Sequence, residues 1–179
     1  MEQSLLIAGF GGQGVMLIGK TLSHASVDAG KFSTFFPAYG AEQRGGTANC
    51  TVIVSDSEPI DCPLREQFDT IIIMNELSFT RFAGALKPGG TLMINSSLVE
   101  ARPDPSVKTV TVDTAKIAGE VGSPKVANMV MLGAYIGYTG IYDVDAIKKL
   151  IGQALAKRPE MAELNARAID AGVAAVSAS

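Results

Sequence analysis

Residues 5–22 read LLIAGFGGQGVMLIGKTL and join a short apolar run to a glycine cluster and a helical pattern. The run Leu5–Ala8 predicts a buried strand, and Gly9–Gly14 predicts a tight turn after it. From here to residue 29 the apolar residues recur at helical spacing and share one face: Val15, Ile18, Leu22, Ala25 and Ala29. Gly30 is expected to end this helix. The chain therefore opens with a strand, a glycine turn and a helix.

Further along the chain, strand patterns and helix patterns alternate. Extended or β-branched runs predict strands at residues 32–36, 48–54, 70–74, 91–95 and 107–112. Helical patterns, caps and stop signals predict helices at residues 77–86, 114–121, 124–138, 143–158 and 161–176. Pro37 is expected to end the second strand. Lys87–Gly90 is expected to end the helix at residues 77–86. The alternation predicts a single α/β domain over residues 1–179, with helices on both faces of a mainly parallel sheet.

The composition narrows the classes of function. The 15 basic and 18 acidic side chains give a formal charge of −3, which excludes a nucleic-acid binder that relies on neutralising phosphates. Hydrophobic residues make up 47% of the chain and charged residues 18%, so the chain can bury a core. Cys50 and Cys62 are too few for a disulfide framework or a four-thiolate metal site, and they fit a reducing compartment.

No targeting segment and no membrane segment is expected. The first residues, MEQSL, lack the basic start and the long apolar stretch of a signal peptide. The longest uncharged run, Val126–Tyr142, is shorter than the ~20 apolar residues that a membrane span needs. We therefore expect a cytoplasmic protein without membrane contact.

The glycine cluster is the sharpest candidate site. Gly9, Gly11, Gly12 and Gly14 satisfy the pattern G-x-G-x-x-G between a predicted strand and a predicted helix. Glycine adopts positive φ and lets the backbone approach a ligand closely. The amides at a helix N-terminus attract anions, with the helix dipole behind them. The cluster favours a phosphate or pyrophosphate ligand, and a tight turn without a ligand is the alternative.

A dinucleotide-binding enzyme would need one more feature. An acidic residue at the end of the second strand holds the ribose hydroxyls in such enzymes, but residues 32–36 read FSTFF and Pro37 follows. Asp28 comes too early for this role, and Glu42 comes too late. A phosphate-binding P-loop is excluded because no Gly-Lys-Ser/Thr closes the turn.

Three polar side chains further along the chain are candidates to complete the site. Lys20 lies opposite the apolar face of its helix, so it either reaches back to a phosphate near Gly14 or is an ordinary solvated lysine. Arg44 either forks a phosphate or carboxylate or pairs with Glu42. Asn128 opens an apolar helix, where it either forms a local bond or faces a ligand.

Three motifs, in this order along the chain, resemble those of one known family. They are Gly9–Gly14, then Pro37–Gly46, which reads PAYGAEQRGG, and then Asn128–Ala134, which reads NMVMLGA. Together they resemble the gamma subunit of the 2-oxoacid:ferredoxin oxidoreductases. The 2-oxoglutarate branch is the most similar, and the branched-chain and pyruvate branches come next. The resemblance implies a three-layer α/β/α fold like domain III of pyruvate:ferredoxin oxidoreductase.

The resemblance also implies the chemistry of the whole assembly. The family oxidatively decarboxylates a 2-oxoacid with coenzyme A, which gives an acyl-CoA, carbon dioxide and reduced ferredoxin. Thiamine diphosphate lies between the alpha and beta subunits, and iron–sulfur clusters lie in the beta subunit or in a small ferredoxin-like delta subunit. The gamma subunit supplies no ligand to either group, so we expect no catalytic residue in this chain and no activity from it alone.

Within this chain, the resemblance implies a contribution to coenzyme A binding. By motif position, the contacts fall on Gly11, Gly12, Gln13, Gly14, Lys20 and Asn128. Arg44 is a further candidate, although the fused enzymes have a different residue at its position. Two other functions remain open: a stand-alone dinucleotide-binding oxidoreductase, and a purely structural subunit whose glycine turn contacts a partner chain.

Overall fold

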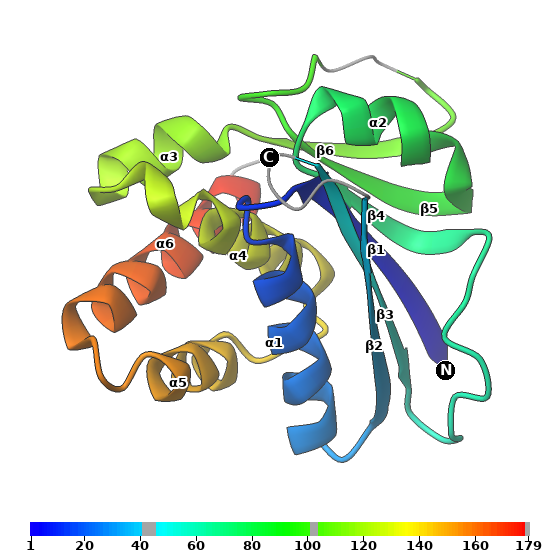
Figure 1. The fold of residues 1–179 in the computed structure, drawn as a ribbon, viewed down its shortest axis with the longest axis horizontal. Coiled ribbons are helices and arrows are strands. Elements are labelled where there is room, and N and C mark those ends of the chain that lie inside the picture. Colours follow the sequence, from blue (N-terminus) through cyan, green and yellow to red (C-terminus); the bar gives the residue numbers. More distant parts are fainter. Residues whose placement is uncertain (41–45, 101–103, 178–179) are drawn as a thin grey trace. The chain divides into compact units, whose positions relative to one another are not determined.

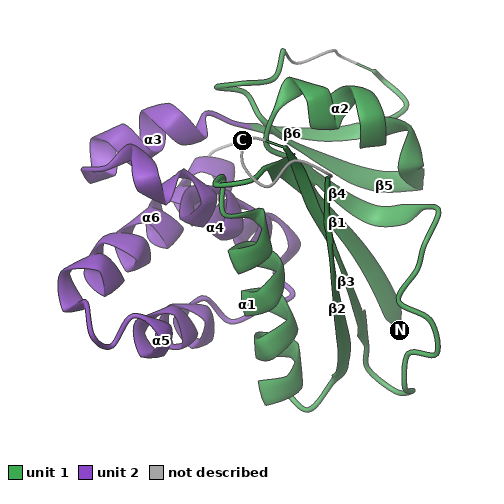
Figure 2. Ribbon diagram, viewed as in Figure 1, with its two compact units in different colours: residues 1–111 green, residues 112–179 purple. Residues whose placement is uncertain are grey.

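The computed structural model describes residues 1–40, 46–100 and 104–177, which form two compact units (Figure 2). The first unit is Met1–Thr111 and the second is Val112–Ser179. The prediction of a single domain over residues 1–179 stays a prediction.

The first unit is built on a six-stranded sheet with the order β2-β3-β1-β4-β5-β6 (Figure 1). The strands are β1 (Glu2–Phe10), β2 (Phe32–Tyr39), β3 (Thr47–Ser55), β4 (Phe68–Ile73), β5 (Leu86–Asn95) and β6 (Lys108–Val112). Its helices are α1 (Val15–Asp28) and α2 (Glu76–Phe82), and a 3-10 turn (Ala83–Ala85) follows α2. The predicted α/β class is confirmed.

The sheet is mixed. Strand β1 is parallel to β4, and β4 is parallel to β5, whereas β3 is antiparallel to both β1 and β2. The connection from β2 to β3 explains this arrangement, because parallel neighbours need a crossover of a dozen or more residues. Only residues 40–46 separate the two strands, so they pair as antiparallel neighbours.

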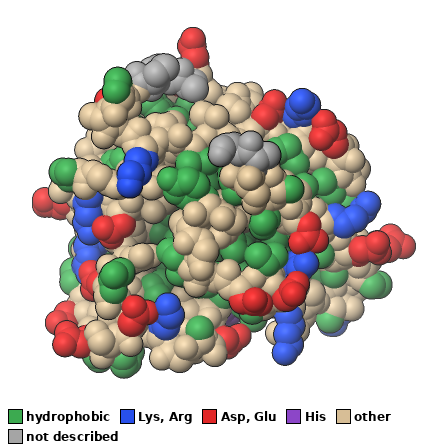
Figure 3. Space-filling model, turned by 180° about the vertical axis from the view of Figure 1, so that it is seen from behind, with side chains coloured by type: hydrophobic (Ala, Val, Ile, Leu, Met, Phe, Trp, Pro, Cys, Tyr) green, Lys and Arg blue, Asp and Glu red, His purple; other side chains and the backbone are tan. Residues whose placement is uncertain are grey.

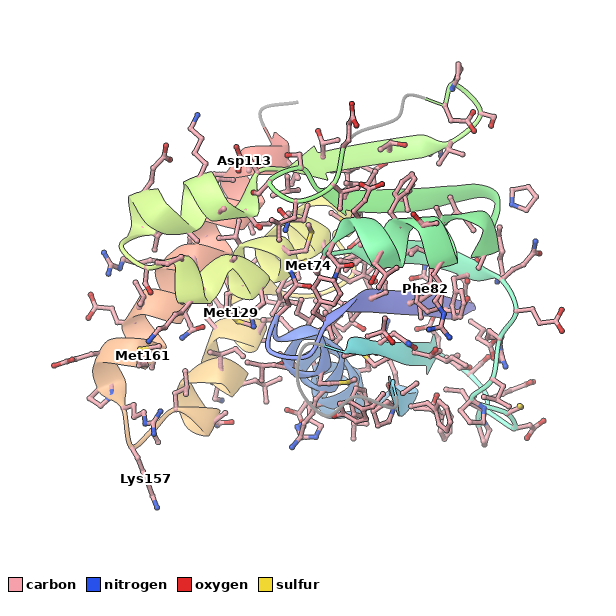
Figure 4. All side chains as sticks on the ribbon, turned by 45° about the horizontal axis from the view of Figure 1, so that its top comes forward. Met74, Phe82, Asp113, Met129, Lys157 and Met161 are labelled. Atoms are coloured by element: carbon pink, nitrogen blue, oxygen red, sulfur yellow. The ribbon has the colours of Figure 1, made fainter. Side chains whose placement is uncertain are left out.

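Helices α1 and α2 cover opposite faces of this sheet (Figure 1). Side chains alternate along β1, so that Leu6 and Ala8 join the cluster beneath α2, against which Phe82 packs. Figure 4 labels Phe82 at the end of α2. On the other face, the Cys50 thiol donates to the Val15 carbonyl in the first turn of α1 (3.4 Å). The first unit alone thus contains a helix layer on each side of its sheet.

The strand limits differ from the predicted ones, and two strands include residues that were expected to lie outside them. Strand β2 continues through Pro37 to Tyr39, because β2 is an edge strand and proline is tolerated where no neighbour needs its amide. Strand β5 begins at Leu86 and includes Lys87–Gly90, which was expected only as a helix stop. The pairing of β4 with β5 is irregular between Phe68 and Thr70, which absorbs this stretch.

The second unit is helical. It contains α3 (Thr114–Val121), a 3-10 turn (Pro124–Val126), α4 (Ala127–Thr139), α5 (Val144–Ala154) and α6 (Pro159–Ser177). Its helix starts follow the predicted caps, since Ser123 accepts from the Lys125 amide and Asp143 accepts from the Ala146 amide (2.7 Å). Asp113 caps α3 in the same way. Figure 4 labels Asp113 there and Lys157 between α5 and α6.

Helices α4 and α6 of the second unit pack closely against each other. A side chain at Gly133 of α4 would overlap the carbonyl of Ile169, and one at Gly172 of α6 would overlap the carbonyl of Val130. Met129, labelled in Figure 4, is fully buried in the same part of α4. The backbones of the two helices therefore contact each other directly, because these two glycines have no side chain.

Among the described residues, no helix is both long enough and apolar enough to cross a membrane. Acidic and basic side chains are interspersed over the face shown in Figure 3. That face presents no field of a single charge sign, which agrees with the small formal net charge.

Candidate glycine-turn site

The predicted glycine turn lies between the end of β1 and the start of α1. Gly12 and Gly14 have φ values of 100° and 76°, a region that side chains disfavour. The Gln13 amide donates to the Phe10 carbonyl (3.1 Å), and the Gly11 amide donates to the Gly46 carbonyl (2.9 Å). The turn therefore reverses the chain direction with its outer surface formed by backbone.

The start of α1 offers unsatisfied donors. Gly14 is the N-cap residue and supplies no side-chain cap, and the first turn of α1 contains no acidic residue. Within the described residues, the amides of Gly12 and Gly14 donate to no protein acceptor. A side chain built on Gly12 would meet no atom within 4 Å, so the space beside the turn is open. Free amides, the helix dipole and open space together suit an anion.

The Gln13 side chain points into the protein. Its Oε1 accepts from the Phe10 amide (2.7 Å) and from Nδ2 of Asn75 (2.8 Å), and its Nε2 donates to the Met74 carbonyl (3.2 Å). Met74, labelled in Figure 4, directly follows β4. Gln13 was predicted as a coenzyme contact, and its carboxamide is largely committed to shaping the turn.

Asn75 is a site residue that the sequence reasoning missed. It is 3% exposed and caps α2, because its Oδ1 accepts from the Ser78 amide (2.9 Å). The available signal was an asparagine two positions after the β-branched run of a parallel strand. Residues at the carboxyl ends of such strands border ligand sites in α/β sheets.

Lys20 is exposed on α1, as predicted. It lies in the second turn of the helix, and the side chains of a helix lean toward its N-terminus. No ion pair holds Lys20 among the described residues. Its side chain is thus available to a ligand.

Residues 14–21, GVMLIGKT, also match the letters of the P-loop pattern, a match that the sequence reasoning passed over. The structure rules out that loop, because Val15–Thr21 is regular α1 helix. A side chain at Gly19 would lie 2.5 Å from Cys50 Sγ, so Gly19 is the close contact between α1 and the sheet. The glycine turn, and not Gly19–Thr21, carries the candidate site.

The remaining predicted contacts lie elsewhere. Arg44 falls outside the described residues, as does Glu42. Asn128 lies in the first turn of α4, in the second unit, and is half-buried. Of the predicted contacts, the glycine turn and Lys20 lie in one strand–turn–helix segment.

The two cysteines have different environments. Burial raises the pKa of the Cys50 thiol to about 12, against a smaller lowering by a hydrogen bond with the Gly19 backbone. Cys50 is therefore a neutral thiol at physiological pH, and it packs as a small apolar side chain. Cys62 is exposed. In the described part of the chain, no three His, Cys, Asp or Glu side chains gather as metal ligands would.

The sequence and the fold both match known proteins. The family model of pyruvate ferredoxin/flavodoxin oxidoreductase matches residues 4–175. The chain is 32% identical to ketoisovalerate oxidoreductase subunit VorA of Methanothermobacter marburgensis over 96% of its own length, but it spans only 36% of VorA. Subunits named for 2-oxoglutarate synthase and for pyruvate synthase match at 36% and 31% identity.

Two solved structures are similar over 99% of the chain. One is the gamma subunit of a keto/oxoacid ferredoxin oxidoreductase from Geobacter sulfurreducens, with 31% identity, a TM-score of 0.82 and 99% of that chain covered. The other is the 2-oxoglutarate:ferredoxin oxidoreductase of Magnetococcus marinus, solved with 2-oxoglutarate, coenzyme A and succinyl-CoA bound. It has 26% identity and a TM-score of 0.90, with 31% of that chain covered. The motifs, the fold and these matches agree, and the chain belongs to the pyruvate ferredoxin/flavodoxin oxidoreductase family, in which it represents the gamma type.

Proposed function

We propose that this chain is the gamma component of a multi-subunit 2-oxoacid:ferredoxin oxidoreductase. The assembly oxidatively decarboxylates a 2-oxoacid with coenzyme A and passes the electrons to ferredoxin in the cytoplasm. Thiamine diphosphate and the iron–sulfur clusters belong to alpha and beta partner subunits, or to a small ferredoxin-like delta subunit. The family membership and the names of the relatives support this proposal.

The role proposed for this chain is to hold the pyrophosphate of coenzyme A. One observation carries the proposal: among the described residues no acceptor binds the Gly12 and Gly14 amides before α1, and the start of α1 has no side-chain cap and no acidic residue in its first turn. The space beside Gly12 supports an anion ligand, because a Cβ atom built there would meet no described atom within 4 Å. The coenzyme A bound in the Magnetococcus marinus enzyme supports the same ligand.

The contribution of this chain to the reaction is electrostatic and positional. The Gly12 and Gly14 amides donate to phosphate oxygens, and the dipole of α1 stabilises the negative charge. The Lys20 ammonium adds a positive charge one to two turns along the helix. Held in this way, the coenzyme presents its thiol to the acyl group on the partner subunits, and no proton or electron passes through this chain.

Arg44 and Asn128 complete the proposal. Arg44 is proposed to bind a phosphate or carboxylate of the ligands, and Asn128 is proposed to contact the coenzyme from the start of α4. The 2-oxoacid proposed is 2-oxoglutarate, on the similarity of Pro37–Gly46 to that branch. Relatives are named for ketoisovalerate, 2-oxoglutarate and pyruvate enzymes alike, so the branch rests on this motif.

Calorimetric titration of the assembled complex tests the proposal. We expect coenzyme A to bind, NADH to give no fluorescence change, and the isolated chain to show no turnover with 2-oxoglutarate, thiamine diphosphate and a viologen dye. Binding of NADH in place of coenzyme A would make the chain a dinucleotide enzyme. If substitutions in the glycine turn do not change coenzyme A binding by the complex, this chain has a purely structural role.

A further inference from the structure

A directional chain of hydrogen bonds supports the glycine turn from the neighbouring strand. The Ser78 amide donates to Oδ1 of Asn75 (2.9 Å), and Nδ2 of Asn75 donates to Oε1 of Gln13 (2.8 Å). The same Oε1 accepts from the Phe10 amide (2.7 Å), and Nε2 of Gln13 donates to the Met74 carbonyl (3.2 Å). Four hydrogen bonds thus join the end of β1 to the end of β4 and the start of α2.

The direction of these hydrogen bonds is fixed by the backbone groups at the two ends of the series. A backbone amide occupies Oδ1 of Asn75, so the amide nitrogen of this side chain must face Gln13. Gln13 must then present its oxygen to Asn75 and its nitrogen to the Met74 carbonyl. Reversing either carboxamide would place two donors or two acceptors face to face.

The missing side chain of Gly9 provides the space for the Gln13 carboxamide. A Cβ atom on Gly9 would lie 2.7 Å from Oε1 of Gln13 and 3.0 Å from Cβ of Met74. Asn75, at 3% exposure, is shielded from water that could replace its hydrogen bond. The orientation of Gln13 therefore depends on Asn75, a residue 62 positions further along the chain.

We propose that Asn75 is a positioning residue for the anion site, which it shapes by fixing Gln13. Gln13 holds the Phe10 amide on one side of the turn, and the turn aims the Gly12 and Gly14 amides outward. This inference rests on the proposed function for its ligand, coenzyme A, but the shape of the turn can be measured without any ligand.

Two substitutions separate this role from the helix cap. Asn75→Asp keeps an oxygen for the Ser78 amide but replaces the donor to Gln13 with a second acceptor. Asn75→Ser also keeps a good cap, and the serine side chain is too short to reach Gln13. Because serine is neutral, this variant still tests the inference if the buried carboxylate of Asn75→Asp prevents folding. Both variants should leave the start of α2 intact and release Gln13.

The first measurement is the hydrogen exchange of the Phe10 amide in the ligand-free full chain. With Gln13 released, this amide should exchange roughly tenfold faster, as expected for the loss of one hydrogen bond. Asn165→Asp is the matched control, because it removes a buried amide donor to the Met161 carbonyl on α6 (2.6 Å). We expect Asn165→Asp to lower the melting temperature without changing the Phe10 exchange rate.

The second measurement is the coenzyme A affinity of the assembled complex, read by calorimetry. Asn75→Asp should weaken binding roughly tenfold and raise KM for coenzyme A, while decarboxylation of the oxoacid up to the coenzyme-dependent step proceeds at the wild-type rate. If Asn75 acts through Gln13, Asn75→Asp should weaken binding no further in a Gln13→Ala background.

The outcomes are distinct. An unchanged Phe10 exchange rate in both Asn75 variants overturns the inference, and so do additive affinity losses in the double variant. Faster Phe10 exchange in a complex whose wild-type form binds no coenzyme A overturns the proposed function, while it upholds the control of the turn by Asn75. Faster exchange together with non-additive loss of affinity supports both.

Discussion

Two sets of glycines in this chain serve opposite purposes. At the turn before α1, Gly12 has a φ of 100° and Gly14 a φ of 76°, and the space beside Gly12 is empty. Between α4 and α6, side chains at Gly133 and Gly172 would overlap backbone atoms of the opposite helix. In the first case the missing side chain leaves backbone amides uncovered, and in the second it lets two helices touch. A count of glycines therefore identifies no site until the space beside each is known.

The largest effect is expected at the helix contact. Gly133→Ala should lower the free energy of unfolding by ~3 kcal/mol or more, because the added methyl group meets the main chain of Ile169, which cannot move like a flexible side chain. Urea denaturation followed by circular dichroism measures the loss. Helix propensity alone predicts the opposite sign, a gain of ~1 kcal/mol for alanine over glycine.

Gly119→Ala and Gly152→Ala are the matched controls for this substitution. Both glycines lie within helices, α3 and α5, and a side chain on either would meet no atom within 4 Å. Each variant should gain up to ~1 kcal/mol of stability. If Gly133→Ala were as stable as these two variants, the contact between α4 and α6 would not be as close as described.

At the turn, the expected effect is on binding. Gly12→Val should reduce coenzyme A affinity roughly a hundredfold, because it blocks two charge-assisted amide contacts worth ~1.5 kcal/mol each. It should also raise KM for coenzyme A and leave decarboxylation to the thiamine-bound intermediate intact. Titration of the complex with coenzyme A gives the affinity.

Gly30→Val is the control for backbone strain. Gly30 has a φ of 75°, open space beside it and a place at the other end of α1. Gly30→Val should lower the free energy of unfolding by a similar amount, ~1–2 kcal/mol, without weakening the binding of coenzyme A. If the Gly12 and Gly30 variants bind coenzyme A with equal affinity, the glycine turn does not contact the coenzyme.

Lys20→Ala should affect binding but not folding. An exposed lysine contributes within about 0.5 kcal/mol to stability, whereas one charge-assisted contact to phosphate is worth ~1.5–3 kcal/mol, or roughly a ten- to hundredfold change in affinity. Lys149→Ala removes one exposed charge from α5 and should change neither quantity. Dephospho-coenzyme A then identifies whether Lys20 contacts the 3′-phosphate or the pyrophosphate. A lower melting temperature for Lys20→Ala would give the lysine a structural role.

The local signals in the sequence predicted the local structure well. The strand, turn and helix over residues 5–28 are confirmed, α3 has the predicted limits Thr114–Val121, and Asp143 caps α5. The errors lie where a distant partner decides. Pro37 stays within β2 because β2 is an edge strand, and no local pattern shows which strand lies at an edge.

The same limit applies to the candidate site. The sequence predicts the glycine turn from the spacing of its glycines and from the helical pattern after it. The sequence does not predict the direction of the Gln13 side chain. Gln13 meets Asn75 only because β1 and β4 are parallel neighbours, with Ala8 opposite Ile73 at their carboxyl ends. Strand order is a property of the whole sheet, so the support of the turn became visible only in the structure.

The smallest expected effect concerns acid. Asp69 of β4 accepts from the amide and hydroxyl of Ser4 on β1 (both 2.8 Å) and from Nζ of Lys87 on β5 (2.9 Å). Burial alone would raise the pKa of Asp69, but these hydrogen bonds and the lysine charge hold it below its ordinary value. The ionised carboxylate therefore stabilises the fold above the ordinary aspartate pKa of about 3.9, and this contribution is lost as the pH falls through the lower folded-state pKa.

Because the pair is partly exposed, the loss should be about 1 kcal/mol or less. The atoms that Gly133 and Gly172 face belong to Ile169, Val130 and Ala134, which carry no titratable side chain, so we expect acid to loosen β1, β4 and β5 first. Between pH 5 and pH 2, a range of about three units around that pKa, the protection factor of the Ser4 amide against hydrogen exchange should fall more steeply than those of amides in the middle of α4. In Asp69→Asn, the Ser4 amide should lose this steep dependence. A wild-type Ser4 amide that follows the α4 amides throughout would show that Asp69 does not hold the three strands together.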